Sequence, residues 1–261
     1  MSLEASELQE AFDFAAQIAR EAGDIALKYF RSSLTVETKH DGSEVTIADR
    51  ETEAHLRRRI SEKFPRDGIL GEEENEQAGT SGRRWIIDPI DGTYSFVHGV
   101  PMFGVLVALV VDEDPVVGVV NLPATQELVC AARGFGCFAN GEVARVSETT
   151  SLSEALVLAT DFGTCERFGF GPAAERIQRQ ARARRTWGDC YGYILVATGR
   201  ADIMVDPVMN VWDCAPLLPI LEEAGGTFTD WNGRRTIAGG NAIATNGQLF
   251  AEVMRMVNDE R

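Results

Sequence analysis

The sequence has no long apolar run and only three histidines, and each absence excludes a class of protein. No segment approaches the roughly 18 uninterrupted apolar residues of a membrane-spanning helix, so we expect no membrane partner. The first residues combine acids with helix formers and lack a basic head followed by an apolar stretch. This argues against a secretory signal and favours a cytoplasmic location. The histidines show no spacing typical of a zinc site.

Basic residues are also scarce, because 25 lysines and arginines stand against 40 aspartates and glutamates, giving a net charge of −15. Such a chain repels the phosphate backbone of nucleic acids, so nucleic acid is not an expected partner. The five cysteines are odd in number and form no C-x-x-C pair, which favours reduced thiols. Cys190 or Cys214 could act as a nucleophile, although buried and unreactive cysteines are more common.

Hydrophobic spacing predicts helices and a sheet in the first half of the chain. Apolar residues three and four positions apart indicate an amphipathic helix over residues 7–31. A second helix is predicted from about Thr46 to Phe64, and its inward residues are expected to be Ile47, Leu56, Ile60 and Phe64. The β-rich segments that follow are Phe103–Val111, Pro115–Leu122 and Glu127–Arg133. The Asn140-Gly141 pair after them is typical of a hairpin turn, so we expect a largely antiparallel sheet covered by helices.

From about residue 150 the pattern changes to alternating strands and helices. The expected elements are a strand at 155–160, a helix at 172–182, a strand at 201–205 and a helix at 213–223. The last helix should end at Ala224-Gly225-Gly226, where glycine favours a left-handed stop. Because no repeat or low-complexity linker interrupts the chain, we expect one mixed α and β domain over 1–261, with sub-parts 1–148 and 149–261.

The run from Trp85 to Thr93 carries two acids, Asp88 and Asp91, directly after an apolar segment. Pro89 cannot donate to a sheet ladder, so we expect the strand to stop there and leave both acids at its end. Gly92 and Thr93 then supply a tight turn whose N–H groups can face an anion. Carboxylates beside exposed amides suit a hard cation that bridges a phosphate.

Further acids stand at the ends of other predicted elements. Glu72 follows the apolar run 69–71, Asp213 follows Trp212 at a helix start, and Asp49 lies within a helical pattern. Each has an ordinary alternative: a solvated acidic loop for Glu72, an N-cap for Asp213 and a surface position for Asp49. A two-magnesium site for phosphoryl displacement needs about four acids from separate segments, each at the end of an element. Glu72, Asp88, Asp91 and Asp213 meet that description.

Three motifs together resemble the signatures of the inositol monophosphatase family. They are G-E-E at 71–73, D-P-I-D-G-T at 88–93 with Phe96 following, and W-D with a later E-E-A-G-G at 212–226. The resemblance implies an α+β fold, a layered α-β-α-β-α sandwich, that is usually dimeric. It also implies a magnesium-dependent, lithium-sensitive phosphatase acting on a small phosphate monoester.

The resemblance also implies a set of metal ligands. Glu72, Asp88 and the backbone carbonyl of Ile90 would hold one Mg2+. Asp88, Asp91 and Asp213 would hold a second, so that Asp88 bridges the two ions.

The remaining catalytic roles follow from the same resemblance. A third, looser Mg2+ would contact Glu72 through water, and the amides of Gly92 and Thr93 would bind the phosphate. Thr93 together with Asp49 would orient the attacking water, whose pKa the metals lower. Lys39 would steady the loop over the metals.

The segment that should determine the substrate lies in the second half. The pattern T-W-G-D-x-Y-G-Y at 186–193 is similar to the histidinol-phosphate phosphatase branch of the family, and Asp206 stands where inositol-cleaving members have glutamate. Histidinol phosphate carries an ammonium group and an imidazole, whereas inositol phosphate presents only hydroxyls. Asp189 and Asp206 would favour the cation, and Tyr191 or Trp187 could pack on the ring.

Several alternatives stay open from the sequence. Inositol 1-phosphate, or a broad set of small phosphate esters, could be the substrate. Trp187 and Tyr193 could be core residues, and Asp189 could cap a helix that starts at Tyr191. A non-catalytic phosphate- or metal-binding regulator on the same fold is a different class of function. A nucleotide 3′-phosphatase relative is a weaker alternative because the chain is short.

Overall fold

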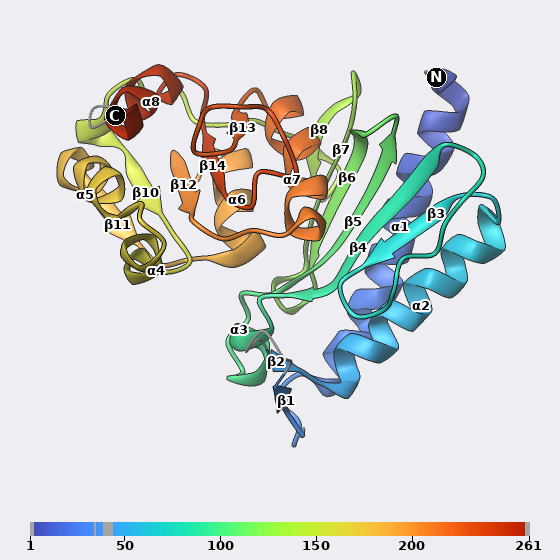
Figure 1. The fold of residues 1–261 in the computed structure, drawn as a ribbon. Helices are drawn as coiled ribbons and strands as arrows, with labels where there is room; N and C mark the ends of the chain where they lie inside the picture. Colours follow the sequence, from blue (N-terminus) through green and yellow to red (C-terminus); the bar gives the residue numbers. More distant parts are fainter. Residues whose placement is uncertain (1–2, 34, 39–43, 259–261) are drawn as a thin grey trace.

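The computed structural model describes residues 3–33, 35–38 and 44–258, and its elements form five layers (Figure 1). Two helices cover one face of a seven-stranded sheet, and two more helices lie between that sheet and a five-stranded one. Three helices cover the outer face of the second sheet. This arrangement is the α-β-α-β-α sandwich that the family resemblance implied. Each of the gaps between a sheet and its helices is filled by an apolar cluster.

The first layer consists of α1 (Ala5–Tyr29) and α2 (Ile47–Lys63), as predicted. In α2, the Thr46 hydroxyl accepts the N–H of Ala48 while the Asp49 side chain accepts the N–H of Thr46, which closes a capping box at the helix start. The prediction that Ile47 faces inward is wrong, because its side chain is 45% exposed. Asp49 is the inward residue, and two positions turn a helix by about 200°.

The seven-stranded sheet contains every strand predicted in the first half. Its order is β3-β4-β5-β6-β7-β8-β9, and the only parallel pair in this sheet is β3–β4. The two-residue loop Asn140-Gly141 has positive φ at both positions and joins β8 to β9, which confirms the predicted hairpin. The strands are β3 Gly68–Gly71, β4 Arg83–Asp91, β5 Gly104–Val111, β6 Asp114–Leu122, β7 Glu127–Ala132, β8 Gly136–Ala139 and β9 Glu142–Ala144.

Strand β4 does not stop at Pro89, so that prediction is wrong. The strand continues to Asp91, but its register against β5 shifts between Asp88, which pairs with Leu106, and Asp91, which pairs with Gly104. Proline cannot donate to the ladder, and the strand absorbs this as an irregularity in place of an end. The shift lies between the two acids.

The five-stranded sheet has the order β11-β10-β12-β14-β13. Its parallel pairs are β10–β11 and β10–β12, and its antiparallel pairs are β12–β14 and β13–β14. The predicted strand–helix–strand–helix order corresponds to β10, α5, β12 and α7, and the remaining elements are additional. The strands are β10 Leu156–Leu158, β11 Ala183–Arg185, β12 Ile203–Asp206, β13 Thr227–Thr229 and β14 Ala242–Thr245. The outer helices are α4 Phe162–Arg167, α5 Gly171–Gln180 and α8 Phe250–Asn258.

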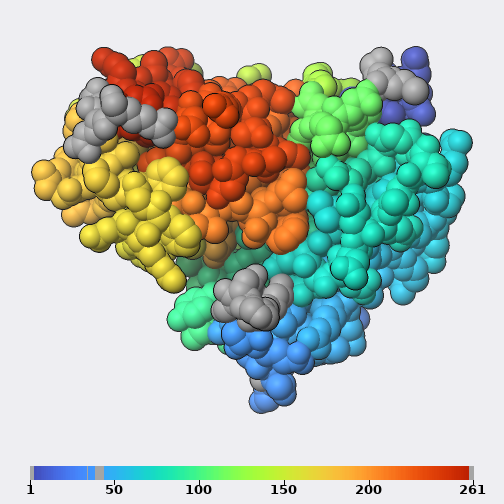
Figure 2. All heavy atoms as spheres, viewed as in Figure 1, coloured from blue at the N-terminus to red at the C-terminus, as the bar shows by residue number. Residues whose placement is uncertain are grey.

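The central layer contains α6 (Asp189–Ala197) and α7 (Val211–Glu223). Both helices contribute to one large apolar cluster that also takes side chains from both sheets. A Cβ on Gly118 in β6 would lie 2.1 Å from the Pro216 carbonyl oxygen of α7, so glycine permits the close contact of helix and strand. Gly225 follows α7 with φ of +91°, which is the predicted left-handed stop. Figure 2 shows the first and second halves meeting directly on one face of the molecule.

Short elements connect these layers. They are the paired strands β1 (Glu37–Thr38) and β2 (Glu44–Val45), the helix α3 (Thr93–Val97) and two 3-10 turns at Pro123–Thr125 and Leu152–Glu154. Within the described ranges, no helix has both the length and the apolar run that crossing a bilayer requires.

Candidate active site

Three aspartates from separate elements meet where the two halves of the chain join. Asp88 and Asp91 lie at the end of β4, and Asp213 lies in the first turn of α7. One carboxylate oxygen from each can be chosen so that all three atoms lie within 4.8 Å of one another. We call these three residues the acid cluster.

Each carboxylate of the acid cluster is oriented by a backbone N–H. Asp88 Oδ1 accepts from Ile90 at 3.0 Å, Asp91 Oδ2 accepts from Cys190 at 2.5 Å, and Asp213 Oδ2 accepts from Asn210 at 2.7 Å. Asp213 is therefore part of a capping box, in which Asn210 is the N-cap, and it also faces the other two acids. The alternative that Asp213 is itself the N-cap is therefore wrong, because it occupies the third helical position of α7.

Burial of the acid cluster disfavours the ionised form of its three carboxylates, and their mutual repulsion adds to this effect. Burial, followed by the Asp213 charge, raises the pKa of Asp91 to about 7, and burial raises the pKa of Asp213 to about 7. Burial is also the main cause that raises the pKa of Asp88, and the neighbouring Glu72 charge adds to it. Three converging carboxylates are a hard oxygen donor set, so these residues fit a divalent cation such as Mg2+.

Glu72 lies beside the acid cluster but outside the group of three. It follows β3 directly and is partly buried, whereas Glu74 and Glu76 further along the loop are exposed. Its charge contributes to the raised pKa of Asp88 after the larger effect of burial. The solvated-loop alternative therefore fits Glu74 and Glu76, while Glu72 faces the acids.

Asp49 approaches the same place from the start of α2 and is fully buried, so the surface alternative for it is wrong. Its Oδ2 accepts the N–H and the hydroxyl of Thr46 at 2.7 and 2.8 Å. The Thr93 hydroxyl donates to the Ile90 carbonyl oxygen at 2.9 Å and lies 3.5 Å from Asp49 Oδ1. Gly92 has φ of +82° and forms the N-cap of α3, which begins at Thr93. Lys39 lies outside the described residues.

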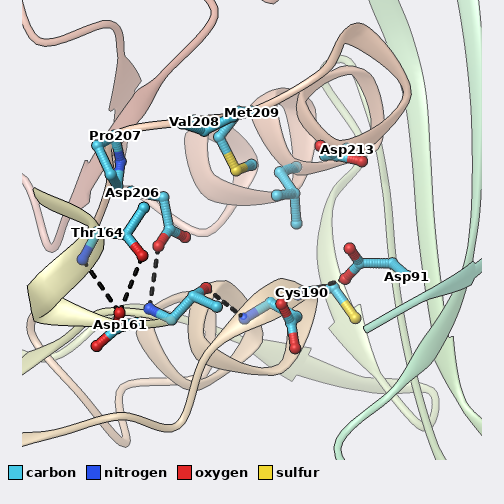
Figure 3. Close-up of a pocket in the computed structure, with 12 residues that line it drawn as sticks. Asp91, Asp161, Thr164, Cys190, Asp206, Pro207, Val208, Met209 and Asp213 are labelled. Carbon is cyan, nitrogen blue, oxygen red and sulfur yellow. Dashed lines mark hydrogen bonds between the residues drawn. The ribbon is translucent and has the colours of Figure 1, made fainter. Parts of the chain in front are cut away.

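A cavity of about 130 Å³ opens beside the acid cluster (Figure 3). Asp91 and Asp213 belong to its lining as well as to the cluster, and Asp206 and Asp161 lie toward its other end. The aspartates that line the cavity are Asp91, Asp161, Asp189, Asp206 and Asp213. A cavity with this lining is complementary to a positively charged group.

Asp206, at the end of β12, is held by hydrogen bonds from Thr160 and Tyr193. Its Oδ1 accepts the N–H of Thr160 at 3.0 Å, and its Oδ2 accepts the hydroxyl of Tyr193 at 3.0 Å. The side chain is 3% exposed, and this burial raises its pKa to about 7. The Thr160 side chain also hydrogen-bonds to this carboxylate. An ionised carboxylate has about four lone-pair sites, so about one remains for another donor.

Asp189 is the first residue of α6 and has an unusual backbone conformation, with φ of +52°. Its N–H donates to the Thr160 hydroxyl at 2.9 Å. The N-cap of α6 is Gly188 and no side-chain cap bond forms there, so the prediction that Asp189 caps a helix from Tyr191 is wrong. Burial and the Asp91 charge raise the pKa of Asp189 to about 7.

The aromatic residues of this segment occupy different environments. Tyr193 is fully buried in the central core, as its core alternative predicted, whereas Trp187 is 41% exposed. Tyr191 is half-buried against the central core and does not line the cavity. Cys190 and Cys214 are buried, and burial raises the pKa of both thiols well above the ordinary value. This environment argues against a thiolate nucleophile.

Sequence reasoning missed the segment that follows β10, although it lines the cavity. Asp161 accepts the N–H groups of Gly163 and Thr164 and thereby caps α4, and Thr160 and Thr164 line the cavity with it. The available signal was Thr160-Asp161 at the end of a predicted strand. Asp88, Asp91 and Glu72 were predicted as site residues from the same kind of position, so the end of the predicted strand at 155–160 offered an equivalent signal.

Comparison with known proteins supports the same chemistry. The model of the inositol monophosphatase family matches residues 7–260. The chain is 45% identical to a histidinol-phosphatase of Chlorobaculum parvum, covering 88% of this chain and 90% of that protein. It is 40% identical to a histidinol-phosphatase of Mycobacterium tuberculosis, covering 86% and 88% respectively. A solved inositol monophosphatase from Zymomonas mobilis superposes with a TM-score of 0.85 at 34% identity, covering 98% and 99%.

Proposed function

The chain belongs to the inositol monophosphatase family and is a phosphoric monoester hydrolase, and from this premise we propose that it hydrolyses L-histidinol phosphate to L-histidinol and phosphate with bound Mg2+. The reaction would belong to histidine biosynthesis. We further propose that it takes place in the cytoplasm, that the enzyme is a homodimer and that Li+ inhibits it.

The observation that carries the choice of substrate is the aspartate-lined cavity beside the acid cluster. A substrate whose phosphate is held at the cluster would place its alcohol portion in this cavity. Histidinol phosphate brings an ammonium group there, which Asp189 and Asp206 can accept, whereas inositol 1-phosphate brings only hydroxyls. A charge-assisted hydrogen bond contributes about 1.5–3 kcal/mol, so it favours the cationic substrate. Two relatives named histidinol-phosphatase, at 45% and 40% identity, support the same choice.

Glu72, Asp88, the Ile90 carbonyl, Asp91 and Asp213 would hold the metal ions, two or three in number. Bound Mg2+ would lower the pKa of a water and stabilise negative charge that develops on the phosphoryl oxygens. The backbone hydrogen bonds to the acid cluster keep these carboxylates aimed at one point before substrate arrives. The chain thereby avoids reorganising its ligands during the reaction.

Thr93 and Asp49 would orient the attacking water. The Thr93 hydroxyl is held by the Ile90 carbonyl, and its oxygen keeps lone pairs that can accept a hydrogen bond from water. Asp49 is fixed by Thr46 and lies close enough to share the same proton network. The N–H groups of Gly92 and Thr93 would donate to the phosphate oxygens and set the phosphorus opposite that water.

On the side of the phosphorus opposite the attacking water, the P–O bond to the alcohol oxygen would break, and histidinol would leave into the cavity. Asp189 and Asp206 would hold its ammonium and so fix the direction of the leaving group. The hydroxyl and amide of Thr160 connect the two aspartates, since the hydroxyl accepts from Asp189 and the amide donates to Asp206. One residue therefore sets the spacing of both candidate cation ligands.

A substrate panel tests the proposal. With Mg2+ present, histidinol phosphate should give a higher kcat/KM than inositol 1-phosphate or p-nitrophenyl phosphate, and chelation by EDTA should remove all three activities. Higher kcat/KM on inositol 1-phosphate would contradict the choice of substrate and favour the activity named for the Zymomonas mobilis structure. Preferential hydrolysis of an adenine nucleotide would indicate a nucleotide phosphatase. Absence of Mg2+-dependent phosphate release on every substrate would indicate a non-catalytic binding protein.

A further inference from the structure

A second buried acid on α2, Glu53, contacts the loop that carries Glu72. The Glu53 side chain is fully buried, and its two carboxylate oxygens accept two successive backbone N–H groups. Oε2 accepts from Glu73 at 2.8 Å, and Oε1 accepts from Glu74 at 3.0 Å. The carboxylate therefore binds the backbone of the loop at the two positions directly after Glu72.

Arg57, one turn further along α2, compensates the buried charge. Its Nε donates to Glu53 Oε1 at 2.7 Å, and its Nη2 donates to the Glu74 carbonyl oxygen at 2.9 Å. The loop residue Glu74 is thus held at its N–H by Glu53 and at its carbonyl by Arg57. Breaking such a buried pair leaves an uncompensated charge, which is strongly unfavourable, so the pair is a rigid support.

Gly71 provides the space for this arrangement on the other side of Glu72. A Cβ on Gly71 would lie 2.3 Å from Glu53 Oε1 and 2.6 Å from its carboxyl carbon. The carboxylate therefore lies directly against the backbone of Gly71, where any larger residue would displace it. Glu72 therefore lies between Gly71, against which the Glu53 carboxylate packs, and Glu73, whose N–H donates to that carboxylate.

The same helix face carries Asp49, four residues before Glu53. Residues four apart lie on one side of a helix, and both side chains are fully buried. Figure 1 shows α2 beside β3, the strand that ends at Gly71. The position of α2 therefore fixes Asp49 directly and the Glu72 loop through Glu53. Glu72 in turn faces Asp88, where its charge adds to the effect of burial in raising the pKa of that carboxyl.

We propose that Glu53, supported by Arg57, is a positioning residue that holds the loop 71–74 so that Glu72 faces the metal ions. This inference rests on the proposed function, because it takes Glu72 as a ligand of Mg2+. Glu53 itself contacts neither metal nor substrate. It acts by removing the freedom of the loop, so that Glu72 need not be ordered when the metal binds. Partners that orient metal ligands typically change metal affinity about 10- to 100-fold.

The test compares Mg2+ binding in the wild-type chain and in Glu53→Gln by titration calorimetry, without substrate. Glutamine has one acceptor oxygen, so it can satisfy only one of the two loop amides. We expect the dissociation constant for Mg2+ to rise about 10- to 100-fold. The Mg2+ concentration needed for half-maximal activity should rise in parallel, while kcat at saturating Mg2+ changes much less. A purely structural role would not produce that separation.

Asp67→Asn is the matched control. Asp67 is also buried, and it accepts from Arg83 Nε at 3.0 Å and from Trp85 Nε1 at 3.1 Å, just before the opposite end of β3. Its loss should lower the melting temperature and leave Mg2+ affinity unchanged. Gly71→Ala is the second variant, since its Cβ displaces the Glu53 carboxylate without removing any charge. It should weaken Mg2+ binding in the same direction even where Glu53→Gln does not fold.

The outcomes separate the two hypotheses. If the wild-type chain, Glu53→Gln and Gly71→Ala all bind Mg2+ with equal affinity, the role of Glu53 is overturned and the proposed function stays intact. Equal weakening in Asp67→Asn overturns it as well, because general loosening would then explain the effect. Absence of Mg2+ binding by the wild-type chain overturns the proposed metal site and this inference with it.

Discussion

Replacing Asp206 with asparagine should remove a negative charge from the cavity while keeping the local fold. The amide oxygen of asparagine can still accept the N–H of Thr160, which now bonds Oδ1 at 3.0 Å. The amide nitrogen can donate to the Tyr193 hydroxyl, which then reverses its role from donor to acceptor. Both protein contacts survive, so the variant isolates the charge that we propose the substrate ammonium uses.

The magnitude follows from the one lone-pair site, of about four, that hydrogen bonds from Thr160 and Tyr193 leave free on Asp206. A hydrogen bond between an ammonium and this carboxylate contributes about 1.5–3 kcal/mol. Since 1.4 kcal/mol is a tenfold change, kcat/KM for histidinol phosphate should fall roughly 10- to 150-fold. For p-nitrophenyl phosphate, which has no cation, it should change by less than about threefold, the effect of roughly 0.6 kcal/mol.

The effect should also depend on pH. Burial raises the pKa of Asp206 to about 7, so the side chain is mostly neutral at pH 6 and mostly ionised at pH 8. The preference of the wild-type enzyme for histidinol phosphate over p-nitrophenyl phosphate should therefore increase with pH across this range. In Asp206→Asn the increase should shrink, and what remains should come from Asp189, whose pKa is also raised to about 7.

The assay is phosphate release at saturating Mg2+ on both substrates, from pH 6 to pH 8. Asp161→Asn is the control, because Asp161 lines the same cavity but is exposed to solvent, and its carboxylate accepts two backbone N–H groups and the Thr164 hydroxyl. It should alter the substrate preference far less than Asp206→Asn. An equal fall on both substrates in Asp206→Asn, at every pH, would show that the Asp206 charge does not bind the substrate and would make Asp206 a structural residue.

Two further substitutions test other parts of the molecule. Asp88→Asn should abolish nearly all turnover and weaken Mg2+ binding, measured by phosphate release and calorimetry; wild-type rates would contradict the ligand assignment. Gly118→Ala should lower the free energy of unfolding by about 3 kcal/mol, because its Cβ would lie 2.1 Å from the Pro216 carbonyl oxygen and overpacking of this kind costs about 1–3 kcal/mol or more. Gly163→Ala is the control, because the atom nearest to its Cβ is Asp161 Oδ2 at 3.3 Å. An equal loss of stability in both variants, measured by thermal denaturation, would show that the clash with Pro216 is not responsible.

Most of the helices and strands could be predicted from the sequence, because they are governed by local patterns, whereas the order of the layers was implied by the family resemblance. The helix over 7–31, the antiparallel strands and the Asn140-Gly141 hairpin each follow from spacing or turn chemistry that a few neighbouring residues determine. The errors occurred where tertiary contacts outweigh those patterns. Ile47 is apolar but exposed, since the buried capping box needs Asp49 on the inner side. Pro89 is accommodated by a shift of register because β5 continues to pair beyond it.

The candidate site was less accessible to sequence reasoning for a related reason. Asp88 and Asp91 could be recognised from their own neighbours, whereas Glu72 and Asp213 were selected only as acids at element ends, a position that ordinary surface and capping acids share. Glu53 gave no signal at all. In the sequence it forms an i,i+4 pair with Arg57, as many exposed helix residues do, and the loop that it binds is some 20 residues away. Its role depends on burial, which the local sequence does not encode.

The position of α7 between the two sheets has a consequence for how the chain is made. The face of the first sheet that α6 and α7 cover is apolar, and its side chains include Ile86, Leu106, Val120 and Val129. Strand β9 ends at Ala144, whereas α7 begins only at Val211. Since the N-terminal part of a chain leaves the ribosome first, this sheet can form well before α6 and α7, which cover its second face, have been synthesised. During that interval of synthesis an apolar surface faces water and other nascent chains, so the yield of enzyme depends on how quickly residues 145–223 follow or on chaperones that bind the surface meanwhile.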